Sequence, residues 1–248
     1  MKSIVLSLCV SIFFAGNILF AQDYQQDVIQ TNKGDLTITF IKHGTLMFEY
    51  DGQVIHIDPV MRMGDYSELP KADLIVITHS HGDHFDLNAI EKVSKQNTKI
   101  VATEGCKESS EYLANAMIMN NNEKREIAGL EIKSIPAYNI KHKRDNGQPY
   151  HPKGEGNGYI FTFGGKKVYV AGDTENTPEM KALEGIDVAF LPMNLPYTMT
   201  PEMVADAAKA FKPKILYPYH FGKTDTNKLV RLLKDENNIE VRIRDMGM

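Results

Sequence analysis

The chain has 248 residues, of which 42% are hydrophobic and 24% are charged, and its formal net charge is −4. This length and apolar content suffice for one α/β domain with a sizeable core, and no linker or low-complexity tract divides the sequence. The acidic balance gives no sign of nucleic-acid binding, so we expect no nucleic-acid partner.

The first 21 residues have the pattern of a secretory signal peptide. Lys2 precedes an apolar run from Ile4 to Phe20, and the small Ala21 offers a cleavage point before Gln22. We therefore expect export to the periplasm or the extracellular space, and a single mature domain over residues 22–248. The alternative is a retained membrane anchor. The run is short for a span and contains polar residues, so we expect no stable membrane span after cleavage.

Two apolar stretches early in the mature chain predict a β-hairpin. Leu46–Tyr50 and Gln53–Ile57 flank Asp51-Gly52, a dipeptide that favours a two-residue turn. The second strand ends directly before Asp58. The hairpin therefore delivers a carboxylate to a strand end, where α/β proteins commonly place their chemistry.

The most informative stretch follows the next predicted strand, Asp73–Thr78. Within six residues it places three imidazoles and one carboxylate: His79, His81, Asp83 and His84. Several such side chains on one strand-end loop need a cation to stabilise them, which indicates a metal site. Imidazoles and carboxylates suit zinc first, with manganese and iron as the competitors.

The spacing of this motif predicts two metal ions. Side chains alternate in direction along an extended segment, so we assign His79 and His81 to one ion. The turn allowed by Gly82 directs the next two side chains elsewhere. We therefore assign Asp83 and His84 to the other ion.

The second half repeats the pattern of strands that lead to polar residues. The predicted strands occupy Gly158–Phe163, Lys166–Ala171 and Ile215–Tyr219. The second of them leads to Asp173, and the third leads to His220. Apolar spacing predicts helices over Asp86–Ser94, Pro201–Phe211 and Thr226–Lys234, with Thr200 as the N-cap of the middle one.

The motif His-x-His-x-Asp-His after a buried strand resembles the metallo-β-lactamase superfamily. The resemblance continues through the segments at Asp58, Asp173 and His220, in the family's order. It implies a four-layer αββα sandwich with a dinuclear metal site at one rim. It also implies that Asp173 bridges the ions, that His220 completes the second site, and that Asp58 orients ligands.

Within that superfamily, the chain is most similar to the ascorbate-phosphate lactonase-like branch of metal-dependent hydrolases. Lys42–Tyr50 resembles a Gly-His-Ala-Ser-Phe segment of that branch, and Leu195–Pro201 resembles another stretch found there. This resemblance makes His43 a candidate for the rim of the site. Tyr197 and Lys153 are candidates for orienting a substrate, because both lie in loops that should approach the metals. The branch is chemically mixed, so its substrates do not carry over.

One departure from the family concerns a histidine that is usual between the second and fourth motifs. The matching place holds Asn139, whose amide oxygen is a poorer zinc ligand than an imidazole. Either Asn139 ligates, or His142 or His151 takes the role, or one ion is held loosely. We favour His151, which leads into a glycine-rich approach to the next strand. His142 lies between two lysines, as in a solvated loop.

These residues predict a hydrolase that uses two divalent ions and a water, without a serine or cysteine nucleophile. We expect Asp173 and Asp83 to act in catalysis, with Asp83 moving a proton where it is not consumed as a ligand. The expected small-molecule substrate is a lactone or another ester. Phosphodiesterase or phospholipase-type chemistry is the alternative among enzymes, and a non-catalytic metal- or ligand-binding scaffold is the alternative outside them. The sequence leaves the oligomeric state open.

Overall fold

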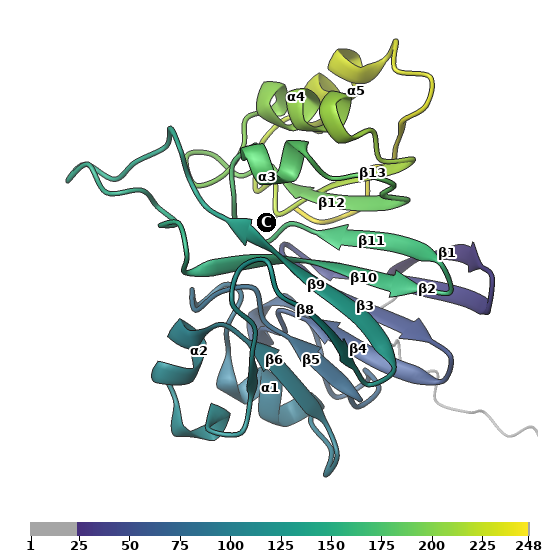
Figure 1. Ribbon diagram of the computed structural model, residues 1–248, viewed down its shortest axis with the longest axis vertical. Coiled ribbons are helices and arrows are strands. Elements are labelled where there is room, and N and C mark those ends of the chain that lie inside the picture. The colour runs from purple at the N-terminus through teal and green to yellow at the C-terminus, as the bar shows by residue number, and fades with distance from the viewer. Residues whose placement is uncertain (1–23, 248) are drawn as a thin grey trace, which may run out of the picture.

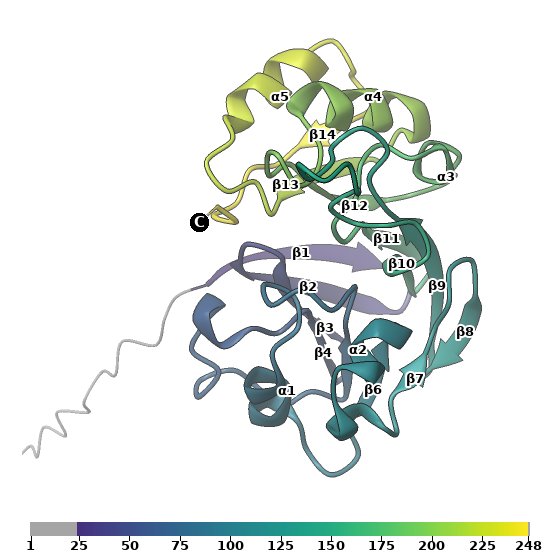
Figure 2. The same ribbon diagram turned by 90° about the vertical axis from the view of Figure 1, so that its left-hand side faces the viewer.

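The computed structural model describes residues 24–247, so the predicted signal segment lies outside the described residues. Within this range two seven-stranded sheets face each other, and helices cover the outer face of each (Figure 1 and Figure 2). The predicted four-layer αββα sandwich is confirmed. No helix between residues 24 and 247 has the length and apolar character needed to cross a bilayer.

The first sheet is built in chain order. Its strands are β1 (Gln25–Thr31), β2 (Gly34–Lys42), β3 (Thr45–Tyr50), β4 (Gln53–Ile57), β5 (Leu74–Val76), β6 (Lys99–Ala102) and β7 (Met117–Ile118). Strands β1 to β4 are antiparallel neighbours, and β4 to β7 are parallel. The predicted hairpin of β3 and β4 pairs in the register that Asp51-Gly52 demands, with Tyr50 opposite Gln53.

The second sheet repeats this succession. Its strands are β8 (Lys124–Ile127), β9 (Leu130–Ala137), β10 (Gly156–Phe163), β11 (Lys166–Val170), β12 (Val188–Pro192), β13 (Ile215–Tyr219) and β14 (Glu240–Val241). Strands β8 to β11 are antiparallel, and β11 to β14 are parallel. The two halves of the chain therefore have the same strand plan, although no repeat is visible in the sequence.

Helices fill the connections between the parallel strands. They are α1 (Leu87–Val93), α2 (Glu104–Glu108), α3 (Pro178–Lys181), α4 (Pro201–Phe211) and α5 (Thr226–Leu233), with short 3₁₀ turns at Met61–Met63 and Glu111–Leu113. The Asp86 carboxylate caps α1 by accepting from the backbone N–H of Asn88 at 3.0 Å. Thr200 caps α4 as predicted, since its hydroxyl accepts from the backbone N–H of Met203 at 3.2 Å.

Three apolar clusters hold the layers together. The central cluster lies between the sheets. There the ring centroid of Phe48 is 6.0 Å from that of Phe161 and 6.1 Å from that of Phe190. The outer two lie under α1 and α2 on one side and under α3, α4 and α5 on the other. Leu229 and Leu233 of α5 are buried in the latter, in agreement with their helical spacing.

Four strands deliver polar residues to one rim of the sandwich. Asp58 follows β4, the loop 79–84 follows β5, Asp173 follows β11 and His220 follows β13. Since β4 and β5 are parallel, as are β11, β12 and β13, their carboxyl ends lie at the same edge of each sheet. The fold therefore gathers side chains as far apart in the sequence as Asp58 and His220.

Candidate metal centre

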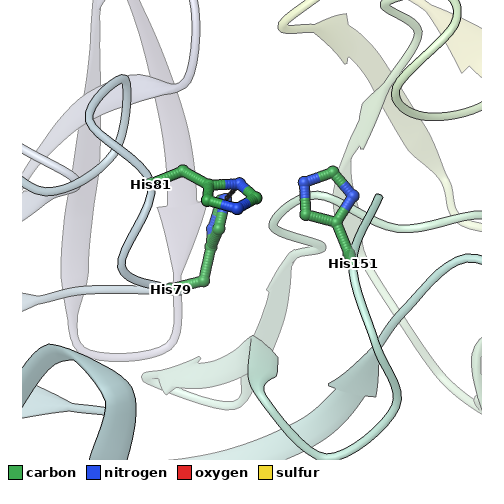
Figure 3. Close-up of side chains that lie close together, drawn as sticks. All are labelled: His79, His81 and His151. Carbon is green, nitrogen blue, oxygen red and sulfur yellow. Dashed lines mark hydrogen bonds between the residues drawn. The ribbon is translucent and has the colours of Figure 1, made fainter. Parts of the chain in front are cut away.

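The first group of potential ligands consists of His79, His81 and His151, hereafter the first cluster. One ring nitrogen of each lies within 4.8 Å of the others. His79 and His81 come from the loop after β5, and His151 comes from the long connection between β9 and β10. Figure 3 shows the three rings pointing toward one another from the two halves of the chain.

The second group consists of Asp83, His84, Asp173 and His220, hereafter the second cluster. Its ligand atoms also lie within 4.8 Å of one another. His220 Nε2 is 3.3 Å from Asp83 Oδ2, and His84 Nε2 is 3.3 Å from Asp173 Oδ1. The structure thus separates the loop residues into the two pairs that their spacing predicts.

Asp173 belongs to the second cluster and also faces the first. Its Oδ1 faces His84 and His220, whose Nε2 atoms are 3.3 and 3.5 Å away. Its Oδ2 lies 3.3 Å from His151 Nε2 in the first cluster. A buried carboxylate with one oxygen toward each cluster has the geometry required to bridge two ions.

Several buried atoms in these clusters have no hydrogen-bond partner, which tests whether a cation fits. His84 Nε2 and Asp173 Oδ1 face each other at 3.3 Å, yet neither completes a hydrogen bond within the described part of the chain. An unsatisfied buried donor or acceptor is costly, so a cation between such atoms would offset that cost. The donor set of imidazoles and carboxylates fits a divalent ion such as zinc.

Burial favours the neutral imidazole form of His79 and His81 in the first cluster by lowering the pKa of each. Loss of solvent lowers the pKa of His79 well below its usual value. His79 Nε2 lies 3.1 Å from His81 Nδ1. Neutral imidazole is the form that binds metal, so the surroundings prepare these rings for an ion.

Asp58 supports ligands in both clusters, although it belongs to neither. Its carboxylate accepts from the Thr78 backbone N–H and hydroxyl, each at 2.7 Å, and lies 2.7 Å from His84 Nδ1. A carboxylate only accepts, so Nδ1 of His84 carries a proton and Nε2 is left to face Asp173. The Thr78 hydroxyl is also 3.0 Å from His79 Nδ1, which extends the same support to the first cluster.

Close packing around His84 requires a glycine at position 44. A Cβ there would lie only 2.7 Å from His84 Cε1 and 3.3 Å from His220 Cδ2. The segment Lys42–Tyr50 therefore has a steric role at the centre. Its His43 is 2% exposed, its ring centroid lies 3.6 Å from that of His220, and its Nε2 is 3.3 Å from Asp83 Oδ2.

Asn139 lies behind His151 and does not point into the first cluster. Its Oδ1 accepts from the His151 backbone N–H at 2.9 Å and lies 2.6 Å from His151 Nδ1, so His151 Nε2 is left to face Asp173. Its Nδ2 donates to the Tyr197 carbonyl at 2.8 Å. The structure therefore brings His151 to the cluster and makes Asn139 its support, while the ligand role of His151 stays a prediction.

His142 lies away from both clusters and contacts Glu175, a residue that the sequence interpretation missed. The fully buried Glu175 carboxylate accepts from the backbone N–H groups of Ile140, Lys141 and His142, at 2.8, 2.7 and 2.6 Å. It also contacts Asn139 Nδ2 at 3.3 Å. Glu175 thus fixes the loop that carries Asn139. Its position two residues after Asp173 was the available signal.

Asp83 is the more accessible carboxylate of the centre, with a side chain 30% exposed. Burial alone would raise the pKa of Asp83, but hydrogen bonds from the His220 and His43 rings hold it well below its usual value. Asp83 is therefore ionised and able to ligate a cation or accept a proton.

Two cavities meet at the centre, and both are bordered by His81, His151 and Asp173. The larger has a volume of about 890 Å³, and its wall includes His43 and Tyr197. The smaller has a volume of about 310 Å³ and lies toward α2. A small molecule can therefore reach the centre from the larger cavity.

Lys153 contacts residues outside the two clusters. Its Nζ lies 2.6 Å from Glu179 Oε1 and 4.7 Å from the centroid of the Tyr138 ring. It is not among the residues that line either cavity at the centre. Lys153 is thus held by Glu179 and Tyr138, and its role in substrate orientation stays a prediction.

Comparisons with known proteins agree with this geometry. Residues 37–220 match the beta-lactamase superfamily domain. A UPF0173 metal-dependent hydrolase of Geobacillus thermodenitrificans is 32% identical over 198 residues, covering 75% of this chain and 86% of that protein. The crystal structure of a protein described as a metal-dependent hydrolase from Parabacteroides distasonis is 49% identical, covers 90% of this chain and all of that one, and has a TM-score of 0.85. Igni18, a metallo hydrolase from Ignicoccus hospitalis, is 26% identical over 86% of this chain and 96% of its own, with a TM-score of 0.70. The chain therefore belongs to the metallo-β-lactamase superfamily and is a metal-dependent hydrolase of that family.

Proposed function

We propose that the protein uses two divalent ions, zinc in the first place, to hydrolyse a lactone or another ester of a small molecule. The observation that carries this proposal is the placement of Asp173, whose two oxygens lie 3.3 Å from ring nitrogens of different clusters. A carboxylate shared in this way suits a dinuclear centre better than two independent sites. Manganese and iron are the competing metals because of the carboxylate ligands.

Each half of the chain contributes to both ions under this proposal. The first cluster would hold one ion and the second cluster the other, with Asp173 shared between them. Two bound ions supply an acidified water and a positive field at the oxygen of the attacked carbonyl. The protein contributes the orientation of the ligands, through Asp58 behind His84 and Asn139 behind His151.

Proton movement is assigned to Asp83 when its carboxylate is not bound to an ion. Its Oδ2 lies between the Nε2 atoms of His43 and His220, at 3.3 Å from each, and it borders the larger cavity. Its exposure gives a proton a path to solvent that the buried Asp173 lacks. Tyr197, whose side chain is 45% exposed on the wall of the same cavity, is placed to orient the substrate.

A hydrolysis screen on metal-reconstituted protein tests the proposal. The panel contains lactones, carboxylic esters, phosphodiesters and β-lactams, each assayed before and after chelation. We expect turnover of a lactone or ester that chelation abolishes and that zinc or manganese restores. Faster turnover of phosphodiesters would favour the alternative activity. Full activity after complete metal removal would contradict metal dependence.

Metal content tests the number of ions separately. We expect elemental analysis after mild purification to approach two divalent ions per chain, because seven potential ligands exceed what one tetrahedral site uses. A stoichiometry that stays at one after addition of zinc or manganese would contradict the dinuclear centre.

We also propose that the protein is exported. Support comes from Lys2, the apolar run Ile4–Phe20 and the small Ala21 that closes it. Mass spectrometry of protein from the native host should find a mature N-terminus near Gln22. Soluble mature material that retains Met1 would contradict export.

A further inference from the structure

Three basic residues line the larger cavity without a carboxylate partner. Arg62 comes from the 3₁₀ turn after β4, Arg144 from the connection between β9 and β10, and Lys223 from the loop after β13. None of the three forms an ion pair with any described residue. Arg125 and Arg244, by contrast, pair elsewhere with Glu123 and Asp27.

The three basic residues place three positive charges on one cavity of a chain whose net charge is −4. Cations from three separate segments repel one another when they surround one cavity, and an anion among them would offset that repulsion. Arg144 is also held in place. Its guanidinium donates to the Tyr150 carbonyl at 3.2 Å and lies 5.3 Å from the centroid of the Tyr150 ring.

The two cavities differ in the charge of their walls, and this difference can orient a charged substrate at the centre. The smaller cavity is lined by Glu104, Glu108 and Glu155, and its described wall contains no lysine or arginine. An anionic group that enters the centre is therefore repelled from the smaller cavity and attracted to the larger one.

The larger cavity also offers an apolar surface. Tyr197 packs edge-on against Tyr150, with ring centroids 5.1 Å apart, and Leu195 is 43% exposed beside them. These side chains can cover a compact apolar part of a substrate, while the basic residues contact its charged end.

We infer that Arg62, Arg144 and Lys223 form an anion-binding rim that recognises a phosphate or carboxylate group on the substrate, away from the bond that is hydrolysed. The inference rests on the proposed function, because it places the hydrolysed bond at the metal centre. It narrows the substrate class to anionic esters and lactones.

The test compares three 4-nitrophenyl esters that share a leaving group: the neutral acetate, the glutarate monoester with a free carboxylate, and the phosphonoacetate. We expect kcat/KM to be higher for an anionic ester than for the neutral one, and the difference to shrink as ionic strength rises. The preferred anionic ester distinguishes a carboxylate from a phosphate-type substrate.

Variants then assign the preference to the rim. Arg62→Gln, Arg144→Gln and Lys223→Gln should each lower the ratio of anionic to neutral kcat/KM, by about tenfold for Arg144→Gln. Lys33→Gln is the matched control, since Lys33 is an exposed, unpaired cation in the turn between β1 and β2, outside the cavity. An unchanged ratio in the triple variant, with metal content and melting temperature equal to wild type, would overturn the inference.

Calorimetric titration separates failure of the rim from failure of the proposed function. Glutarate and glycerol phosphate are titrated into metal-loaded wild type and the triple variant. If no ester is cleaved, ester hydrolysis is contradicted, yet loss of anion affinity in the triple variant still supports the rim. Equal affinity of wild type and triple variant for both anions would overturn it.

Discussion

The two ligand clusters differ in what supports their histidines. His84 in the second cluster is backed by the buried carboxylate of Asp58, whereas His151 in the first is backed by the neutral amide of Asn139. A carboxylate partner makes an imidazole a stronger ligand than an amide partner does. The first cluster should therefore bind its ion with lower affinity than the second cluster does.

Loss of the shared Asp173 carboxylate should cause the largest loss of activity and should lower metal binding in both clusters. Asp173→Ala leaves two cations with no bridging charge between them, so we expect activity to fall on the order of a thousandfold or more and metal content to drop. Tyr197→Phe is the matched control and should change turnover by about tenfold at most. Turnover and elemental analysis decide the matter, and near wild-type activity of Asp173→Ala would refute the shared role.

Removal of His151 should affect the first cluster alone. His151→Ala is expected to lower the bound metal from about two ions to about one, and activity by about a hundredfold, because an imidazole ligand is lost. His142→Ala is the control, since His142 contacts Glu175 and lies outside both clusters. The assignment fails if the His142 variant loses the ion and the His151 variant keeps it.

Substitution of the supporting residues compares the clusters directly. Asp58→Asn introduces N–H groups where only acceptors fit, so metal affinity should fall by about 10- to 100-fold. Asn139→Ala should keep both ions and weaken the first by about tenfold or less. Competition with a chelator measures both affinities. A greater loss in Asn139→Ala than in Asp58→Asn would reverse the proposed order.

His56 lies outside both clusters, and its protonation should affect the stability of the fold without involving a metal ligand. Burial lowers the pKa of His56 to about 4 from 6.5, although its bond to the Pro70 carbonyl opposes the shift. The unfolded chain binds this proton more readily, so the contribution to stability is present above pH 6.5 and is lost as the pH falls toward 4.

His56→Gln should remove that contribution. Between pH 7 and pH 5, wild type should lose about 2 kcal/mol more unfolding free energy than the variant does. Denaturant unfolding at both pH values, on metal-loaded protein, provides the measurement. Parallel losses in the two proteins would show that His56 does not control the acid sensitivity.

The contiguous part of the site was readable from the sequence because its residues share one loop. His79, His81, Asp83 and His84 follow a single strand, and the alternation of an extended chain separates them into the pairs that the structure shows. The Asp51-Gly52 turn and the Thr200 cap were equally local, and both are confirmed. Local patterns therefore predicted the delivery of the ligands to the rim.

The remaining contacts depend on long-range geometry that no local pattern encodes. Glu175 acts through backbone N–H groups 33 to 35 residues away, which carry no side-chain signature. The contact of Lys153 with Glu179 was also not readable, because Glu179 lies 26 residues further along the chain. The basic rim escaped notice for the same reason, since Arg62, Arg144 and Lys223 line one cavity only in the folded protein.

The shared strand plan of the two sheets has a thermodynamic consequence. Each cluster draws ligands from both halves, with the loop 79–84 from the first and His151, Asp173 and His220 from the second. Ions that bind only the assembled halves shift the folding equilibrium toward the assembled state by mass action. Chelation should therefore weaken the packing between the two sheets as well as stop hydrolysis. The ions would then stabilise the folded protein in addition to serving catalysis.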